Sequence, residues 1–147
     1  ILYRVFFYLI YNKIHMKIFL ILILVLFENI AFSAWDPIHD DKDTGTSYFL
    51  DVKRIIKNKE KIRLWMLEDY EQEQTVKNLK YLSLKIFSEF NCSSSQIKVL
   101  AYSVYQGNMG EGEILFSKGS PIAWEKILPN SVNYYYMNLV CDSKEGD

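Results

Sequence analysis

The sequence predicts an α+β fold, in which an antiparallel β-sheet of about six strands is followed by one C-terminal α-helix. Three observations lead to this prediction. Apolar and polar residues alternate over most of the chain after residue 45, which is typical of half-buried strands. Near the C-terminus the apolar spacing changes to that of a helix. The strands come first and the helix last, an order that favours α+β over a parallel α/β fold.

The N-terminal residues predict a secretory signal peptide. Residues 18–27 are all apolar, a lysine stands just before them, and a small-x-small site ends at Ser33. A basic start, a short apolar stretch and such a site are the three parts of a signal peptide. A membrane-spanning helix needs about 20 apolar residues, and this run is only half as long. We expect residues 16–33 to be the signal peptide and residues 1–15 to be translated from upstream of the true start.

The remaining residues, 34–147, have the usual size of one domain. Residues 1–33 carry three basic side chains and one acidic one, so a chain of net charge −1 leaves a mature domain of net charge −3. This mild acidity gives no general argument for binding nucleic acid. In an oxidising compartment Cys92 and Cys141, the only two cysteines, are expected to form one disulfide rather than a metal site.

The first strand is expected at residues 46–51, after Gly45. A polar turn at residues 57–60 precedes a second strand at residues 61–70, and the polar residues 71–78 predict a loop. Four acidic residues before the first strand predict a turn rather than a calcium site, because their spacing fails the EF-hand pattern. These residues are Asp36, Asp40, Asp41 and Asp43.

The clearest strand covers residues 79–92, and strands at residues 97–105 and 113–117 follow it. A glycine-rich hairpin connection at residues 107–112 joins the last two, and an irregular stretch lies between Pro121 and Pro129. In the clearest strand the even-numbered residues from 82 to 92 are apolar except for Ser88, and they predict a side that faces the core. Its apolar members are Leu82, Leu84, Ile86, Phe90 and Cys92.

The C-terminal helix is expected after Pro129, with Asn130 or Ser131 as its N-cap. Tyr134 and Cys141 lie seven residues apart and therefore share a helix face. The three tyrosines at 134–136 cannot all be buried on one helix, so at least one is expected to face solvent. The apolar residues at helical spacing are Val132, Tyr136, Leu139 and Val140.

Basic side chains concentrate around the predicted turn at residues 57–60, where Glu60 alone opposes them. A run of this kind is either a solvated hairpin or a docking site for an anionic partner, and the sequence leaves both interpretations open. Its members are Lys53, Arg54, Lys57, Lys59, Lys61 and Arg63. His39 is the only histidine of the mature chain and has no nucleophile signature beside it, so the sequence predicts no catalytic residues.

A set of landmark residues runs through most of the mature chain in a characteristic order and spacing. They are Trp35, 48–51, 62–67, 69–70, 83–85, 89–92, 105–112, Trp124, 129–131 and Cys141. With these landmarks the chain resembles the surface-adhesin protein E family of exported bacterial proteins. The resemblance implies an antiparallel sheet with a C-terminal helix tied to it by a disulfide. It also implies a surface or periplasmic binding protein, with host matrix proteins as partners of the namesake adhesin.

We therefore expect an exported, non-enzymatic binding module located in the periplasm, at the cell surface or outside the cell. Its expected partner is a protein, from the host extracellular matrix or from the bacterial envelope, and a homodimer is an open alternative. No cofactor, metal, nucleic acid or membrane span after signal cleavage is expected. Two further hypotheses remain. One is a periplasmic structural or accessory protein, and the other is a small-molecule or haem binder that uses tyrosines or His39.

Overall fold

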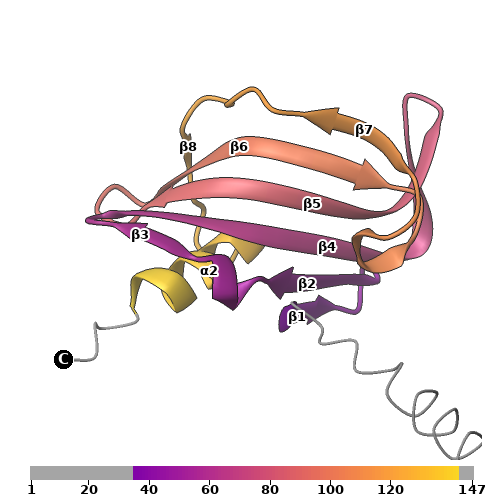
Figure 1. The fold of residues 1–147 in the computed structure, drawn as a ribbon. Coiled ribbons are helices and arrows are strands. Elements are labelled where there is room, and N and C mark those ends of the chain that lie inside the picture. The colour runs from indigo at the N-terminus through magenta and orange to yellow at the C-terminus, as the bar shows by residue number, and fades with distance from the viewer. Residues whose placement is uncertain (1–34, 143–147) are drawn as a thin grey trace, which may run out of the picture. The chain divides into compact units, whose positions relative to one another are not determined.

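A computed structural model describes residues 35–142, which form an antiparallel sheet with an α-helix against one face (Figure 1). The predicted signal peptide, residues 16–33, and the expected upstream segment, residues 1–15, lie outside the described residues. Within the described part of the chain, no helix has the length and apolar character needed to cross a membrane.

The sheet order is β1-β2-β4-β5-β6-β7, with β3 beside β4 and β8 beside β6, and every pairing is antiparallel. The predicted fold class is confirmed, and the strands that the sequence did not predict are short. The strands are β1 (Asp36–Asp41), β2 (Thr46–Leu50), β3 (Ile56–Asn58), β4 (Lys61–Val76), β5 (Leu79–Asn91), β6 (Gln96–Tyr105), β7 (Ile114–Lys118) and β8 (Glu125–Lys126). The helical elements are the 3-10 turns η1 (Val52–Arg54) and η2 (Asn108–Gly110) and the helix α2 (Val132–Cys141).

Residues 71–78 form strand and turn, so the predicted loop is wrong. β4 continues to Val76, β5 begins at Leu79, and the two residues between them both have positive φ, 48° and 69°. This is the backbone that tight two-residue hairpin turns require. Figure 1 shows this hairpin projecting from the sheet at the end away from α2. Because most of its side chains are exposed, it lacks the apolar alternation on which the sequence prediction relied.

The acidic residues near position 40 belong partly to a strand and partly to a turn. β1 extends to Asp41, whose Oδ1 accepts hydrogen bonds from the backbone N–H groups of Asp43 (3.0 Å) and Thr44 (3.3 Å). Hydrogen bonds from Thr44 and Asp43 lower the pKa of Asp41. The predicted turn is therefore present at residues 42–45, whereas β1 was missed because, as an exposed edge strand, it shows no apolar alternation.

The hydrophobic core lies between α2 and one face of the sheet. Ile86 and Phe90 are buried there as predicted, and Leu84 and Cys92 pack against them. On β4 the even-numbered residues from Ile62 to Met66 point to the same side. The buried apolar residues of this cluster are Leu50, Ile62, Leu64, Met66, Ile86, Phe90, Ile97, Ile127, Tyr136, Met137 and Val140.

The predicted disulfide between Cys92 and Cys141 is confirmed, with a Cα–Cα distance of 5.8 Å, and it ties the end of α2 to the end of β5. Ser131 is the N-cap, and its side chain accepts a hydrogen bond from the Tyr134 backbone N–H at 3.3 Å. In the middle of the helix the Tyr136 hydroxyl donates to the Phe49 carbonyl at 2.9 Å. The helix is therefore held to the sheet at its middle and at its C-terminal end.

Candidate binding face

The face of the sheet opposite α2 carries a strip of cationic and aromatic side chains that comes from five separate segments of the chain. On β4 the odd-numbered residues lie on this side, because their even-numbered neighbours fill the core. The strand register places Arg63 opposite Glu89 and Trp65 opposite Phe87. We call this surface the helix-free face and define it by Arg54, Lys61, Arg63, Trp65, Lys85, Phe87, Glu89, Lys98 and Trp124.

The centre of the helix-free face is an aromatic pair with a guanidinium over it. The rings of Trp65 and Phe87 are stacked, with centroids 4.9 Å apart. The Arg54 guanidinium carbon lies 5.7 Å from the Trp65 ring centroid, within the range of a cation–π contact. Arg54 also donates to the carboxylate of Asp51, which is almost fully buried, and this ion pair fixes the guanidinium in place.

Beside this pair, a buried carboxylate is matched to an exposed cation. Glu89 is only 4% exposed, and its Oε2 accepts a hydrogen bond from Arg63 Nε at 2.6 Å. A buried carboxylate without such a partner would be strongly destabilising. About half of the Arg63 side chain is exposed, so the rest of its guanidinium can meet a partner molecule.

At the end of the sheet near the β3–β4 turn, Trp124 lies between two lysines. The Nζ atoms of Lys61 and Lys98 are 5.6 Å and 4.5 Å from the Trp124 ring centroid. Lys61 begins β4, Lys98 is on β6, and Trp124 directly precedes β8, so only the folded sheet brings the three together. This end of the face therefore combines a flat aromatic surface with two ammonium groups.

At the opposite end of the face, Lys85 lies 4.6 Å from the Tyr105 ring centroid and 5.9 Å from that of Trp35. Its Nζ donates to the Gly110 carbonyl at 2.9 Å. Burial lowers the pKa of Lys85, and the nearby Arg54 acts in the same direction. This lysine therefore stabilises the loop above it, in contrast to the exposed Lys61 at the other end.

The connection at residues 107–112 does more than join two strands, because η2 packs back against β4 and β5. The Met109 backbone N–H donates to Asp69 Oδ1, and the Gly110 N–H donates to Ser83 Oγ at 2.8 Å. Gly110 has φ +69°, and a Cβ there would collide with the Lys85 side chain. These contacts explain why Asp69, Ser83 and Lys85 stand among the landmarks.

The predicted basic residues do not form one patch. Arg54 and Arg63 are ion-paired on the helix-free face, and Lys61 lies over Trp124. Lys57 instead lines a groove on the helix side, together with Leu139 and Val140. The other two are exposed: Lys53 lies in η1, and Lys59 is in the β3–β4 turn with φ 53°.

Sequence reasoning missed several members of this face, namely Trp65, Lys85, Phe87, Lys98 and Trp124. Two of them, Lys85 and Phe87, are odd-numbered residues of the clearest strand and lie opposite its predicted core face. The odd-numbered positions of this strand carry charged and aromatic side chains, and this pattern was the signal that could have identified a second functional surface. His39, the residue proposed for haem binding, is stacked against Tyr135 at 5.1 Å and Tyr48 at 6.2 Å.

A single sheet that has a disulfide-tethered helix over part of one face, and exposed or half-exposed cations among half-exposed aromatic rings on the other, defines a surface-binding module. The chain belongs to the surface-adhesin protein E family, whose model matches residues 35–142. This is a family of adhesins and not of enzymes.

The fold is similar to solved structures of Haemophilus influenzae protein E. One has a TM-score of 0.57 and 14% sequence identity over 73% of this chain and 86% of that chain. Another, from a non-typeable strain, has a TM-score of 0.53 and 12% identity over 78% and 79% of the two chains. Identities this low show the shared fold alone. A sequence search of curated proteins finds no match to this chain.

Proposed function

We propose that this chain is an exported binding module that engages a protein partner through the helix-free face. The observation that carries this proposal is the grouping of Arg54, Lys61, Arg63 and Lys98 with exposed or half-exposed rings on one side of the sheet. Arginine and tryptophan are enriched among the residues that dominate binding energy at protein interfaces. The core residues on the other side are already occupied by packing against α2.

The charge on this face favours a partner segment rich in Asp or Glu. The face is locally positive on a domain of net charge −3, so it can attract an acidic segment without making the whole protein adhesive. Membership of an adhesin family supports a host matrix protein as this partner, met at the cell surface. An envelope protein in the periplasm is the other location in which an exported module of this kind could act.

Two double variants test the proposal. Lys61→Glu/Lys98→Glu reverses the two cations around Trp124, and Lys57→Glu/Lys59→Glu makes the same charge change on β3 and its turn. Three of the four lysines are exposed and Lys98 is half-buried, and none belongs to the hydrophobic core, so we expect both proteins to fold. Binding to immobilised matrix proteins and to envelope proteins would be measured by surface plasmon resonance.

We expect the first variant to lose binding and the second to retain it. The wild-type signal should fall as salt is raised from about 0.1 M to 1 M, because the Debye length falls from about 10 Å to about 3 Å. Loss of binding in the second variant alone would instead assign binding to the predicted basic turn. Unchanged binding in both variants, at low salt as well as high, would refute both assignments.

A further inference from the structure

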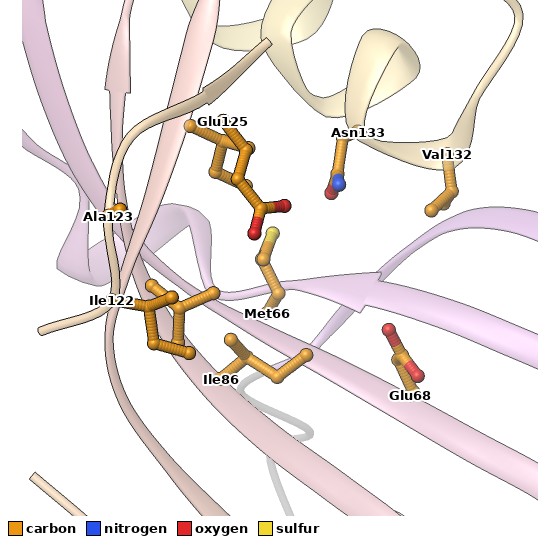
Figure 2. Close-up of a pocket in the computed structure, with 10 residues that line it drawn as sticks. Met66, Glu68, Ile86, Ile122, Ala123, Glu125, Val132 and Asn133 are labelled. Atoms are coloured by element: carbon orange, nitrogen blue, oxygen red, sulfur yellow. The ribbon is translucent and has the colours of Figure 1, made fainter. Parts of the chain in front are cut away.

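On the side of the sheet that faces α2, the helix covers only one end of the long strands. Figure 2 shows this covered end, where Met66 and Ile86 rise from the sheet, with the residue 122–125 segment and the first turn of α2 beside them. Towards the β4–β5 hairpin the same side of the sheet continues, and among residues 35–142 no α-helix lies over it (Figure 1). Apolar side chains in this part of the sheet therefore face solvent or a ligand.

This uncovered part of the sheet forms an elongated groove with a volume of about 290 Å³. Its floor is made by Leu84 of β5 and Val104 of β6, which the strand register pairs. Phe116 of β7 pairs with Val104 and forms one wall. Leu79 and Leu84 are five residues apart on β5, so the groove extends over about 17 Å. The residues that line it are Val76, Lys77, Leu79, Tyr81, Leu84, Tyr102, Val104 and Phe116.

The lining of the groove is mostly hydrocarbon, and part of it is open to solvent. Val76 and Phe116 are 45% and 44% exposed, whereas Val104 on the floor is 5% exposed. Apart from the Lys77 ammonium, the only polar atoms of the lining side chains are the hydroxyls of Tyr81 and Tyr102. A bound peptide would bring backbone N–H and C=O groups, which are costly to bury without partners. The groove therefore suits an alkyl chain better than a polypeptide.

The charge near the groove differs along its length. At the hairpin end Lys77 is in the turn with φ 48°, and among residues 35–142 its ammonium has no ion-pair, hydrogen-bond or ring partner. The nearby Lys80, by contrast, is paired with Glu73 at 2.8 Å. Farther along the groove, Glu68 of β4 lies opposite Leu84. An anionic group is therefore attracted to the hairpin end and repelled by the carboxylate farther along.

We propose that this groove binds a single-chain fatty acid. Its carboxylate would accept hydrogen bonds from the Lys77 ammonium, and its alkyl chain would lie over Leu84 and Val104, beside Phe116. The volume is close to the lower limit of the roughly 300–1,000 Å³ of small-molecule sites, so one chain of medium length fills it. The groove is on the opposite side of the sheet from the helix-free face, so this proposal does not depend on the protein binding proposed there.

The test is a titration of the mature protein, methyl-labelled at leucine and valine, with sodium octanoate at about pH 8 and low salt. The Leu84 and Val104 methyl resonances should shift until they saturate. Leu50 and Val140 line a different apolar groove, beside the C-terminal half of α2, and their resonances should not move. Decanoate should bind more tightly than octanoate, by up to about fourfold for each added CH₂ group, because burying a CH₂ group contributes about 0.8 kcal/mol.

Three variants separate the charge from the chain. Lys77→Gln should weaken octanoate binding by about two- to fivefold, the range of an exposed ion pair, and should leave the binding of uncharged 1-octanol unchanged. Lys118→Gln is the matched control and should bind as wild type does, because Lys118 is exposed opposite Tyr102 and does not line the groove. Phe116→Ala should weaken both ligands several-fold, and it should fold because Phe116 is exposed on an edge strand.

The proposal fails if octanoate leaves the Leu84 and Val104 methyl groups unmoved, or if it shifts those of Leu50 and Val140 instead. It also fails if Lys77→Gln leaves octanoate binding unchanged or weakens octanol binding equally. An effect of Lys118→Gln as large as that of Lys77→Gln would contradict the proposed position of the carboxylate.

Discussion

Removing the disulfide between Cys92 and Cys141 should lower the stability of the fold substantially. The bond closes a loop of 49 residues, for which the chain-entropy relation gives about 4 kcal/mol at 25 °C. This is a large fraction of the roughly 5–15 kcal/mol that stabilises a typical domain. With an unfolding entropy of about 2.1 cal/mol/K per residue over about 110 residues, a Cys141→Ser variant should melt about 15–20 °C lower.

The assay is thermal unfolding followed by circular dichroism, on the oxidised wild type, the reduced wild type and the variant. Reduction removes the bond without changing either side chain, so it is the control for the substitution itself. Amide hydrogen exchange should locate the loss, with the last turn of α2 exchanging faster. The turn that contains Tyr136 should keep more protection, because its hydroxyl still donates to the Phe49 carbonyl. Melting temperatures within a few degrees of each other in all three samples would refute the reasoning.

Two further predictions concern the loop over the helix-free face and the carboxyl of Glu68 on β4, which accepts a hydrogen bond from the Tyr70 hydroxyl at 2.5 Å. Gly110→Ala should lower the free energy of unfolding in urea by about 1–2 kcal/mol, because φ is +69° there, while Gly119→Ala, with open space around it, should have little effect. Glu68→Gln should raise the melting temperature at pH 7 but not at pH 4. Burial raises the pKa of Glu68 above its ordinary 4.5, so the wild type loses stability as pH rises from 4.5 through the raised pKa. An equal effect of Gly110→Ala and Gly119→Ala, or of Glu68→Gln at both pH values, would contradict the respective argument.

The long strands and the helix could be predicted from the sequence because each has one buried side. Ile86 and Phe90 alternate with side chains on the opposite face, and that period of two identifies β5 without further information. The helix was equally clear, since its N-cap at Ser131 and its apolar spacing agree. The strands that were missed, β1, β3 and β8, and the outer part of β4 are mostly exposed, so no apolar period marks them.

The candidate binding face could be predicted only in part, because it depends on strand register. Arg54, Lys61 and Arg63 are close in sequence, and local charge density is enough to find them. Lys98 and Trp124 come from later segments, and they meet Lys61 only because β6 and β8 lie at the same end of the sheet as the start of β4. The density of charge along the sequence gives no information about such a contact between distant segments.

The division of the sheet into two different faces has a geometric cause. A helix of 10 residues is about 15 Å long, whereas a strand of 16 residues extends over about 50 Å. α2 can therefore cover only part of one face, and among residues 35–142 no α-helix lies over the other face. An uncovered face made of apolar residues would expose a large patch prone to association.

The helix-free face avoids such a patch by placing cations over its rings. Arg54 lies over Trp65, and Lys61 and Lys98 lie around Trp124, so these rings contact charged side chains instead of presenting a continuous apolar surface. The aliphatic stems of such side chains cover apolar surface while their charged heads stay in water. An acidic partner can pair with the heads and contact the rings between them, whereas an apolar partner would have to displace the cations first. The same contacts that limit the exposed apolar surface of the free protein therefore select for a charged partner.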